Sequence, residues 1–507
     1  MTHHMRKEGM PLGGQDLPGF IISALGGGSG KTILATGIIA ALNKKGVKVA
    51  PFKKGPDYID AGWLSLAAGC SCYNLDTFLI PGPDVVDSFH RHASPCDLSV
   101  IEGNRGLYDS IHADGRGSTA ELAKMLGLPV ILCLNCSKVT RTMAAIVMGC
   151  LHFDPEVKIK GVVLNRIAGK RHEKNIRKNI ETYTDVPVIG AIPKLSDEKF
   201  PERHMGLVPT YEHEWAAESI QAIGQVISDH VDLDAALDIA ASGCKKGSLS
   251  IASFHPSHHV EDDQNALDGV CSPNSFFIRS HGKTSRRARI GIALDSAFQF
   301  YYPENIDALF QAGAEPVFIS PLKDKIPPPI DALYLGGGFP ETHAEQLSDN
   351  ATFRASIKQM AEEGMPIYAE CGGLMYLGQE IVLSEKSYSM TDVLPVVYGF
   401  SKRPQGHGYT IVHVDKPNPY FAVGSKIMGH EFHYSFVLKW MGSDDQLVFS
   451  MDRGAGFYSG KDGASVKNVL GTYTHIHALG ETSWAESLLG NAEAFKKNRL
   501  PVSPDMR

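Results

Sequence analysis

The stretch GFIISALGGGSGKT, residues 19–32, decides the fold of the first half of this 507-residue chain. Its first seven residues are mostly apolar, as in a buried strand, and its glycines form a turn ahead of the helical pattern of residues 31–46. Glycines let the backbone curl until several N–H groups point at one anion, and a helix N-terminus adds the positive end of its dipole. The stretch therefore predicts a strand, a phosphate-binding loop and a helix, in that order.

Two side chains of this phosphate loop (residues 26–32) have predicted roles in binding a nucleoside triphosphate. Lys31 is expected to neutralise the β- and γ-phosphates, and the Thr32 hydroxyl is expected to hold Mg²⁺. The other residues predicted to bind the nucleotide are Gly28, Ser29 and Gly30. The strict motif has glycine at position 25, where this chain has Leu25. The spacing instead resembles the GGxxGK[ST] variant of the MinD and dethiobiotin synthetase superfamily.

Carboxylates follow several predicted strands close to the phosphate loop. Ligands of open α/β sheets bind beyond the carboxyl ends of the strands. Glu102 ends the predicted strand 98–103, so we expect it to hold Mg²⁺ through its oxygen atoms. A loop aspartate by itself is often a turn or cap residue. Because they gather at the same sheet edge, Asp57, Asp60 and Asp109 are nevertheless candidates for metal or substrate contacts.

Strand and helix patterns alternate after the phosphate loop. The predicted strands are residues 48–53, 98–103, 129–135 and 159–165, and a helix pattern covers residues 119–127. This alternation predicts an α/β fold with a mostly parallel sheet. Cys133 and Cys136 form a CxxC within a strand-like run, and we interpret them as core thiols rather than metal ligands.

The second half of the chain restarts the α/β alternation. Its predicted strands are residues 289–295, 316–320, 331–338 and 366–373, with a helix at 304–314 and antiparallel strands at 409–414 and 446–451. Between the halves lies a segment rich in serine, histidine and charge, which predicts a linker. The predicted organisation is a flexible lead-in at 1–16, one domain at 17–240, a linker at 241–286, a second domain at 287–492 and a tail at 493–507.

Composition excludes several classes of protein. Hydrophobic residues make up 43% and charged residues 21%, as in ordinary globular proteins. The net charge of −7 argues against a nucleic-acid binder, which usually carries a basic excess. No apolar run of about 18 residues predicts a membrane span, and the first residues lack the apolar core of a secretory signal. Nine scattered cysteines favour a reducing cytoplasm.

A sharp turn in the second half carries a cysteine. The sequence Glu370-Cys371-Gly372-Gly373 follows the strand pattern PIYA and precedes a helical pattern. A cysteine at a strand-to-helix turn is expected to be exposed as a nucleophile, and the helix N-terminus is expected to lower its thiol pKa. The N–H of Gly372 and a donor from the glycine turn ending at Gly338 are the predicted oxyanion contacts.

The nucleophile needs a base, and His475 in the strand-like TYTHIH is our candidate to accept the thiol proton. His430 and His433, in GHEFHYS, are rival bases that we rank as substrate-facing or structural. Together these positions predict acyl-transfer chemistry through a thioester.

Seven motifs occur in one order that resembles the cobyrinic acid a,c-diamide synthase family. They are KKGPDYIDAGW, NLDTFL, IEGNRGLYDS, LYLGGGFPE, ECGGLMYL, GHEFHYS and TYTHIH. The resemblance spans about residues 18–490 and implies a dethiobiotin synthetase/MinD-like ATP-dependent amidoligase joined to a class I glutamine amidotransferase-like α/β domain. It implies ATP and Mg²⁺ as cofactors, glutamine and a tetrapyrrole as substrates, and adenine recognition by Asn165. Pairing with a second copy as a homodimer stays open.

The implied reaction is amidation of the a and c acetate carboxylates of cobyrinate through an acyl phosphate, with ammonia from glutamine. Three features depart from the family, and one is Leu25, which replaces the more usual small polar residue of the phosphate loop. His477 stands where a class I glutaminase carries glutamate, although the similar cobyrinic and cobyric acid synthases rely on a Cys–His pair. Asn104 and Arg105 replace the family's usual Val-Met, which keeps hydrogenobyrinate and nickel sirohydrochlorin as alternative substrates.

A MinD- or ParA-like switch ATPase with an inert second domain is the alternative from another class. It predicts a signature lysine at position 25, where this chain has Leu25.

Overall fold

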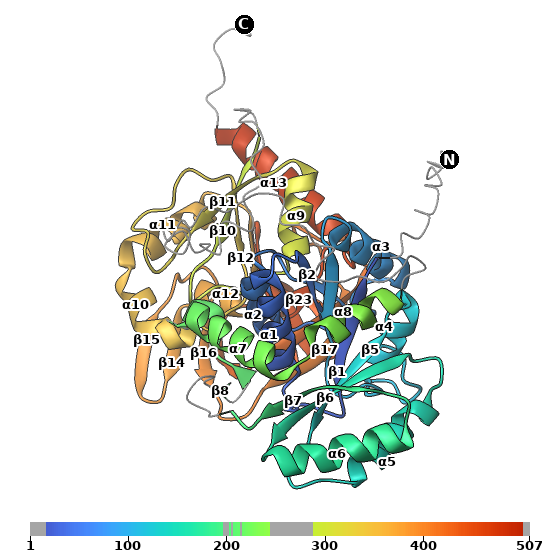
Figure 1. The fold of residues 1–507 in the computed structure, drawn as a ribbon. Coiled ribbons are helices and arrows are strands. Elements are labelled where there is room, and N and C mark those ends of the chain that lie inside the picture. Colours follow the sequence, from blue (N-terminus) through green and yellow to red (C-terminus); the bar gives the residue numbers. More distant parts are fainter. Residues whose placement is uncertain (1–16, 196–201, 204–205, 213–214, 244–286, 500–507) are drawn as a thin grey trace, which may run out of the picture. The chain divides into compact units, whose positions relative to one another are not determined.

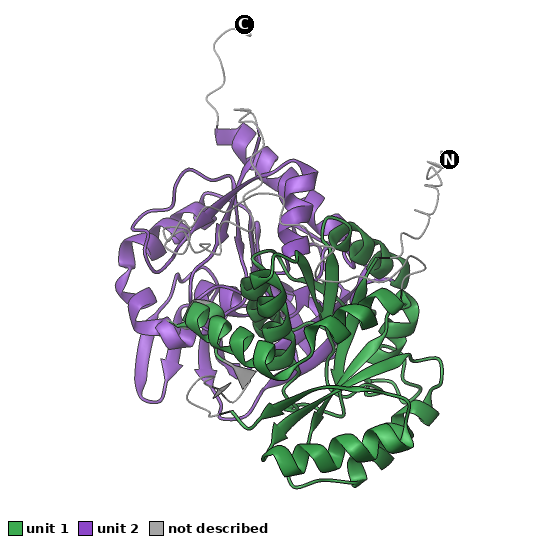
Figure 2. Cartoon of the chain, in the orientation of Figure 1, with its two compact units in different colours: residues 1–77, 82–271 green, residues 78–81, 272–507 purple. Residues whose placement is uncertain are grey.

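The computed structural model describes residues 17–195, 202–203, 206–212, 215–243 and 287–499 (Figure 1). The chain divides into two compact units, of which unit 1 is residues 1–77 with 82–271 and unit 2 is residues 78–81 with 272–507 (Figure 2). The predicted lead-in and almost all of the predicted linker lie outside the described residues.

Unit 1 is built on a seven-stranded sheet in which every neighbouring pair of strands runs parallel, as predicted. The strands are β1 (Gly19–Ala24), β2 (Val49–Lys54), β3 (Tyr73–Leu75), β4 (Leu98–Glu102), β5 (Val130–Asn135), β6 (Ile159–Ile167) and β7 (Val188–Pro193). Their order is β3-β2-β4-β1-β5-β6-β7. The chain therefore reverses its direction of travel across the sheet beside β1, and this is where open parallel sheets place their ligands.

The helices of unit 1 cover the sheet on both faces, because parallel strands need crossover connections. They are α1 (Lys31–Lys44), α2 (Tyr58–Ala68), α3 (Gly82–Ala93), α4 (Thr119–Leu126), α5 (Thr142–Phe153), α6 (Lys170–Tyr183), α7 (Ala216–His230) and α8 (Leu233–Ser242). Leu34, Trp63, Ile223 and Leu237, one from each of α1, α2, α7 and α8, are buried in one core with β1. Figure 1 shows α5 and α6 together beside β6 and β7. A two-residue pair, β8 (Glu202–Arg203) with β9 (Gly206–Leu207), follows β7.

Unit 2 contains a ten-stranded mixed sheet of order β11-β10-β12-β13-β22-β21-β20-β17-β18-β23. Its strands are β10 (Arg289–Ala293), β11 (Glu315–Ile319), β12 (Ala332–Leu335), β13 (Ile367–Glu370), β17 (Gly406–Val414), β18 (Lys426–His433), β20 (Leu447–Arg453), β21 (Lys461–Val466), β22 (Val469–Thr472) and β23 (His475–Ile476). The pairs from β11 to β22 are parallel, and the pairs from β22 to β23 are antiparallel, as predicted for the strands at 409–414 and 446–451.

A second sheet and five α-helices belong to the described part of unit 2 as well. The second sheet has the order β15-β14-β16-β19, with β14 (Glu380–Leu383), β15 (Lys386–Ser389), β16 (Val396–Phe400) and β19 (Ser435–Trp440). The helices are α9 (Pro303–Ala312), α10 (Ala344–Asp349), α11 (Ala351–Glu362), α12 (Gly372–Leu377) and α13 (Ser483–Arg499). Helix α13 runs past the predicted domain end at residue 492, and Phe495 packs into the core of unit 2.

Two further expectations concern the burial of two cysteines and the absence of membrane-spanning helices. Cys133 and Cys136 are both fully buried, as expected for core thiols. Within the described ranges, no helix has the length and apolar character needed to cross a lipid bilayer.

Candidate functional site

The phosphate loop connects the end of β1 to the start of α1 in unit 1. Gly28 and Gly30 have φ values of 66° and 91°, a region that favours glycine. A Cβ atom on Gly30 would lie 2.2 Å from Nδ2 of Asn165, so this position needs glycine for its space as well as its backbone conformation. Ser29 donates its hydroxyl to the carbonyl of Gly26, which tightens the turn.

Lys31 and Thr32 begin helix α1 and point to different partners. Nζ of Lys31 donates to the carbonyl oxygens of Gly26 at 2.9 Å and Arg105 at 2.8 Å, and burial lowers the pKa of this lysine. Oγ1 of Thr32 donates to Oε1 of Glu102 at 2.7 Å. The loop therefore presents one cation and one hydroxyl–carboxylate pair at the end of the sheet.

Glu102 belongs to a buried charge network at the carboxyl ends of β4 and β2. Nζ of Lys53 lies 3.0 Å from Oε1 of Glu102 and 2.7 Å from Oδ2 of Asp60. Burial alone would lower the pKa of Lys53, but the carboxylates of Asp60 and Glu102 raise it, so this lysine stays charged. Burial raises the pKa of Glu102 to about 7, against the opposing attraction of Lys53.

These residues fit a bound Mg²⁺. The second carboxylate oxygen of Glu102, Oε2, is buried without a hydrogen-bond partner among the described residues, and the first already contacts the Thr32 hydroxyl. Mg²⁺ prefers oxygen ligands and typically takes few of them from the protein. Thr32 and Glu102 supply that donor set.

The three candidate aspartates take different places. Asp57 caps helix α2 by accepting the N–H of Asp60 at 2.8 Å, and desolvation raises the pKa of its carboxyl group to about 6. Asp60 is the partner of Lys53. Asp109 is exposed, and its carboxylate accepts a hydrogen bond from the N–H of Gly106. The residue after Gly106 in this loop, Leu107, donates its N–H to the carbonyl of Ala24. All three thus lie in loops or a first helical turn at the carboxyl ends of strands, and their functional roles stay predictions.

Asn165, the candidate for adenine recognition, lies in β6 and forms a hydrogen bond with the phosphate loop. Its Nδ2 donates to the carbonyl of Ser29 at 2.9 Å, and its Oδ1 accepts the N–H of Arg166 at 2.8 Å. The adenine role stays a prediction, while the contact to Ser29 explains why β6 fixes the shape of the phosphate loop.

Cys371 sits at the strand-to-helix turn between β13 and α12 of unit 2, in a strained backbone conformation with φ 44° and ψ −98°. A non-glycine residue in such a region costs roughly 1–3 kcal/mol and occurs mainly at functional sites. The turn is held by hydrogen bonds from Cys371 N–H to the Thr472 carbonyl at 2.8 Å and from Gly373 N–H to the Gly336 carbonyl at 3.0 Å.

Burial contradicts two expectations for this thiol. Cys371 is 4% exposed rather than open, and its Sγ lies 3.8 Å from the carbonyl oxygen of Phe432. Burial raises the pKa of the thiol, and the nearby carboxylate of Glu341 raises it further. Helix α12 has only six residues, so its dipole does not outweigh these effects. The thiol is therefore neutral and needs a base.

The two predicted oxyanion donors lie side by side. The backbone nitrogen of Gly338 lies 2.9 Å from the point where a Cβ on Gly372 would stand. A Cβ on Gly338 would lie 2.0 Å from the carbonyl oxygen of Ala297, so only glycine fits there. The same turn contacts the candidate base, because a Cβ on Gly337 would lie 2.5 Å from Cε1 of His475.

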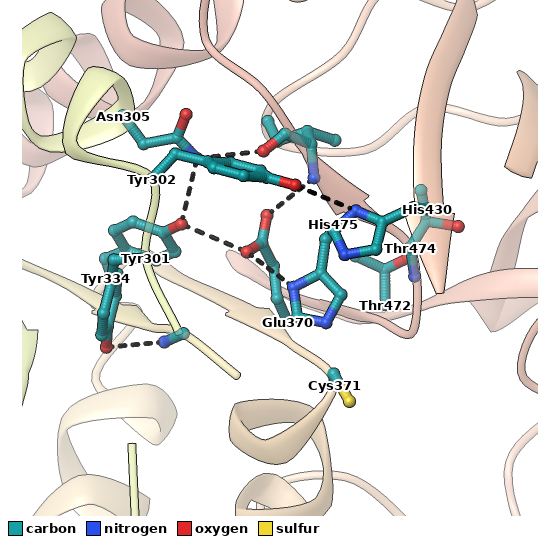
Figure 3. Close-up of polar contacts among 12 residues, drawn as sticks. Tyr301, Tyr302, Asn305, Tyr334, Glu370, Cys371, His430, Thr472, Thr474 and His475 are labelled. Atoms are coloured by element: carbon teal, nitrogen blue, oxygen red, sulfur yellow. Dashed lines mark hydrogen bonds and ion pairs between the residues drawn. The ribbon is translucent and has the colours of Figure 1, made fainter. Parts of the chain in front are cut away.

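His475 is brought to this turn by strand β23, where it is paired with His430 of β18. Its Nδ1 lies 3.4 Å from Oε2 of Glu370, and in Figure 3 the other ring nitrogen is turned toward Cys371. The ring of His430 stacks on that of His475 with centroids 4.8 Å apart. His475, the base predicted from the sequence, is therefore the histidine that lies against the glycine turn at residues 336–338.

The other histidines have separate partners. Nδ1 of His430 is 3.2 Å from the hydroxyl of Tyr302, and burial lowers the pKa of this histidine well below its usual value. His433 stacks on Tyr473 with centroids 3.7 Å apart, and its Nδ1 lies 2.8 Å from the carbonyl oxygen of Ser435. Their partners are the side chains and backbone of the core, which favours structural roles.

Two residues of these sites were missed by sequence reasoning, Lys53 and Glu370. Lys53 is a buried charge within the apolar strand pattern VAPFKK, and Glu370 ends the apolar pattern PIYA. A charged residue in a strand that is buried on both faces needs a partner. The presence of a charged residue at the end of an apolar strand pattern was therefore the signal that could have identified both residues.

Comparisons with known proteins agree with both geometries. A family profile described as "CobQ/CobB/MinD/ParA nucleotide binding domain" matches residues 20–208, and one described as "CobB/CobQ-like glutamine amidotransferase domain" matches residues 289–483. These matches confirm the predicted type of each half.

Similar proteins extend over almost the whole chain. The cobyrinate a,c-diamide synthase of Magnetococcus marinus is 40% identical over 472 residues, which cover 93% of this chain and 96% of that protein. The proteins of the same name from Archaeoglobus fulgidus and Methanosarcina acetivorans are each 37% identical, over 484 and 523 residues. These alignments cover 95% and 98% of this chain, and 99% of each relative.

Proposed function

This chain belongs to the family of cobyrinate a,c-diamide synthases, and we propose that it amidates the a and c acetate carboxylates of cobyrinate or a closely related tetrapyrrole. It is a glutamine-hydrolysing carbon–nitrogen ligase that binds ATP. The observation that carries the proposal is the strained Cys371 turn, where two glycines and His475 gather, on the same chain as a phosphate loop.

Unit 2 supplies nitrogen in this proposal. Sγ of Cys371 attacks the carboxamide carbon of glutamine while its proton passes to His475. The N–H groups of Gly372 and Gly338 stabilise the resulting oxyanion. His475 then gives the proton to the leaving ammonia, and water hydrolyses the thioester to glutamate and free thiol.

Unit 1 activates the acid. A carboxylate does not react with ammonia at neutral pH, because oxide is a poor leaving group, whereas an acyl phosphate has a good one. Transfer of the γ-phosphoryl group requires positioning and charge neutralisation. Lys31 and the phosphate-loop N–H groups supply these, and Thr32 and Glu102 are the residues that would hold Mg²⁺, which neutralises phosphate charge when bound. Ammonia then displaces phosphate to form the amide.

The sequence limits the substrate to a small group of related tetrapyrroles but does not identify one of them. Asn104 and Arg105 follow the Mg²⁺ carboxylate Glu102 and differ from the usual family residues, so hydrogenobyrinate and nickel sirohydrochlorin stay alternatives. Mass spectrometry of products from cobalt, nickel and metal-free macrocycles, each with ATP and glutamine, tests the choice. We expect two amides per macrocycle from cobyrinate. ATP hydrolysis with no amidated product from any macrocycle would overturn the proposal.

The division between the units is tested by the nitrogen source. Replacing the nucleophile, in Cys371→Ala, is expected to abolish amidation from glutamine and to leave amidation from high ammonia. Equal loss with both nitrogen sources would show that Cys371 does not act as the glutaminase nucleophile.

A further inference from the structure

We infer that Glu370 is the positioning residue of the glutaminase: its carboxylate, within ion-pair distance of Nδ1, orients the ring of His475 so that Nε2 faces Cys371 and takes its proton. The inference deepens the proposed function and rests on it. It adds to the Cys–His pair a third residue that precedes the nucleophile in the chain, rather than following the base by two positions.

Glu370 is the last residue of β13 and the immediate neighbour of Cys371. Its side chain is 1% exposed, and its Oε2 lies 3.4 Å from Nδ1 of His475 (Figure 3). Because one peptide unit joins Glu370 to the strained Cys371, a single turn fixes both the nucleophile and the acceptor that orients its base.

Three donors fix the carboxylate itself. The hydroxyls of Tyr334 and Tyr368 donate to Oε2 and Oε1 of Glu370, each at 3.2 Å, and the N–H of Ile476 donates to Oε1 at 3.1 Å. Burial, and then the charge of Glu370, raise the pKa of both tyrosines, so both stay protonated donors. Ile476 follows His475 in β23, so its N–H ties the carboxylate to the strand that carries the base.

This arrangement selects one form of the imidazole. A carboxylate only accepts hydrogen bonds, so the nitrogen that faces Glu370 must be the one that carries hydrogen. The lone pair then lies on Nε2, which accepts the proton from Sγ of Cys371. The imidazolium formed in that step lies against the carboxylate of Glu370, which stabilises its positive charge.

Two neighbouring histidines, His477 and His430, do not orient His475 in place of Glu370. His477, at the position of the usual class I glutamate, has its Nε2 3.5 Å from Oε1 of Glu304 and packs against Tyr302. Its Nδ1 accepts the N–H of Leu479 at 3.2 Å. His430 stacks on His475 but has a strongly lowered pKa, so it brings no charge to the base at neutral pH.

A matched pair of variants tests the inference, because Glu370 and Glu304 are both buried carboxylates 3.4–3.5 Å from a histidine nitrogen. Glutamine hydrolysis and ammonia-driven amidation are measured for Glu370→Gln and Glu304→Gln in the full chain. We expect Glu370→Gln to lower the kcat of glutamine hydrolysis by about 10²–10⁴-fold with a much smaller change in KM, as loss of an orienting carboxylate does elsewhere. Ammonia-driven amidation should match wild type in both variants, and Glu304→Gln should keep its glutaminase activity.

Glu370→Asp adds a readout that a purely structural role would not move. Aspartate keeps the charge but is one methylene shorter, so we expect glutaminase activity above that of Glu370→Gln. Wild-type kcat in Glu370→Gln, equal loss of ammonia-driven amidation, or Glu370→Asp no better than Glu370→Gln would each overturn the inference. Failure of the proposed function would instead appear as no glutamine-dependent amide in the wild-type enzyme.

Discussion

The two sites stabilise buried charge in opposite ways. In unit 1, Glu102 is 1% exposed and is neutralised by the ammonium of Lys53 at 3.0 Å. In unit 2, Glu370 is equally buried but accepts hydrogen bonds from two tyrosine hydroxyls and a backbone N–H. Opposite charges suit the proposed binding of phosphates and Mg²⁺ in unit 1, whereas neutral donors suit the proposed orientation of one imidazole by a single carboxylate in unit 2.

This difference predicts that charge removal in unit 1 lowers amidation from both nitrogen sources, whereas charge removal in unit 2 lowers only amidation from glutamine. We expect Lys31→Ala to lower amidation by at least about 10²–10³-fold with glutamine and with ammonia alike, because a charge aimed at the phosphates is lost. Lys45→Ala, at an exposed lysine after the same helix, is the control and should retain full activity. Near-wild-type ligation by Lys31→Ala would show that the phosphate loop has been misassigned.

The same contrast explains what sequence can predict. The phosphate loop acts largely through its backbone and through neighbours in one short stretch, so residues 19–32 predict its strand, turn and helix in order. Five of the seven parallel strands of unit 1 were predicted because they are buried and appear as continuous apolar runs, whereas β7 was not predicted. Strand β3 escaped because it has three residues, Tyr73–Leu75, too few for any periodicity.

The thiol site is harder to predict because its parts come from distant segments. Cys371 and His475 were predicted from local patterns, but the partner of His475 depends on how the segments of β13 and β23 come together, which no local pattern encodes. The prediction that the pKa of the Cys371 thiol is lowered was wrong for a related reason. A helix start is visible in sequence, whereas burial of Cys371 and the nearby Glu341 come only from tertiary packing.

A steric change in unit 2 should affect only one nitrogen source. Gly338→Ala places a Cβ 2.0 Å from the Ala297 carbonyl, so the turn must shift and its N–H moves from the oxyanion position. We expect glutamine hydrolysis to fall by about 10²-fold or more, with ammonia-driven amidation unchanged. Gly490→Ala, in α13 with open space around it, is the matched control and should have wild-type rates. Normal glutamine hydrolysis by Gly338→Ala would remove this donor from the site.

The raised thiol pKa predicts how Cys371 reacts in the enzyme without substrate. Only thiolate is alkylated, and a raised pKa leaves little thiolate at neutral pH. The rate of iodoacetamide modification at the Cys371 peptide, followed by mass spectrometry, should therefore rise steadily from pH 7 to pH 10. A rate that is already level at pH 7 would indicate a preformed thiolate–imidazolium pair and contradict the neutral thiol.

The smallest expected effect is on stability and concerns Asp57, the cap of α2. Its carboxyl pKa is raised to about 6 from an ordinary value of 3.8, so the folded protein holds a proton more tightly than the unfolded chain. Ionisation therefore costs stability, and that cost is absent below about pH 4, grows as the pH rises toward 6 and is constant above it. Asparagine caps helices as well as aspartate but carries no charge. We expect Asp57→Asn to raise the free energy of unfolding by about 1 kcal/mol at pH 7, with the gain vanishing near pH 4 in urea titrations. An equal gain at both pH values would mean that the carboxylate of Asp57 is not destabilised in the folded protein.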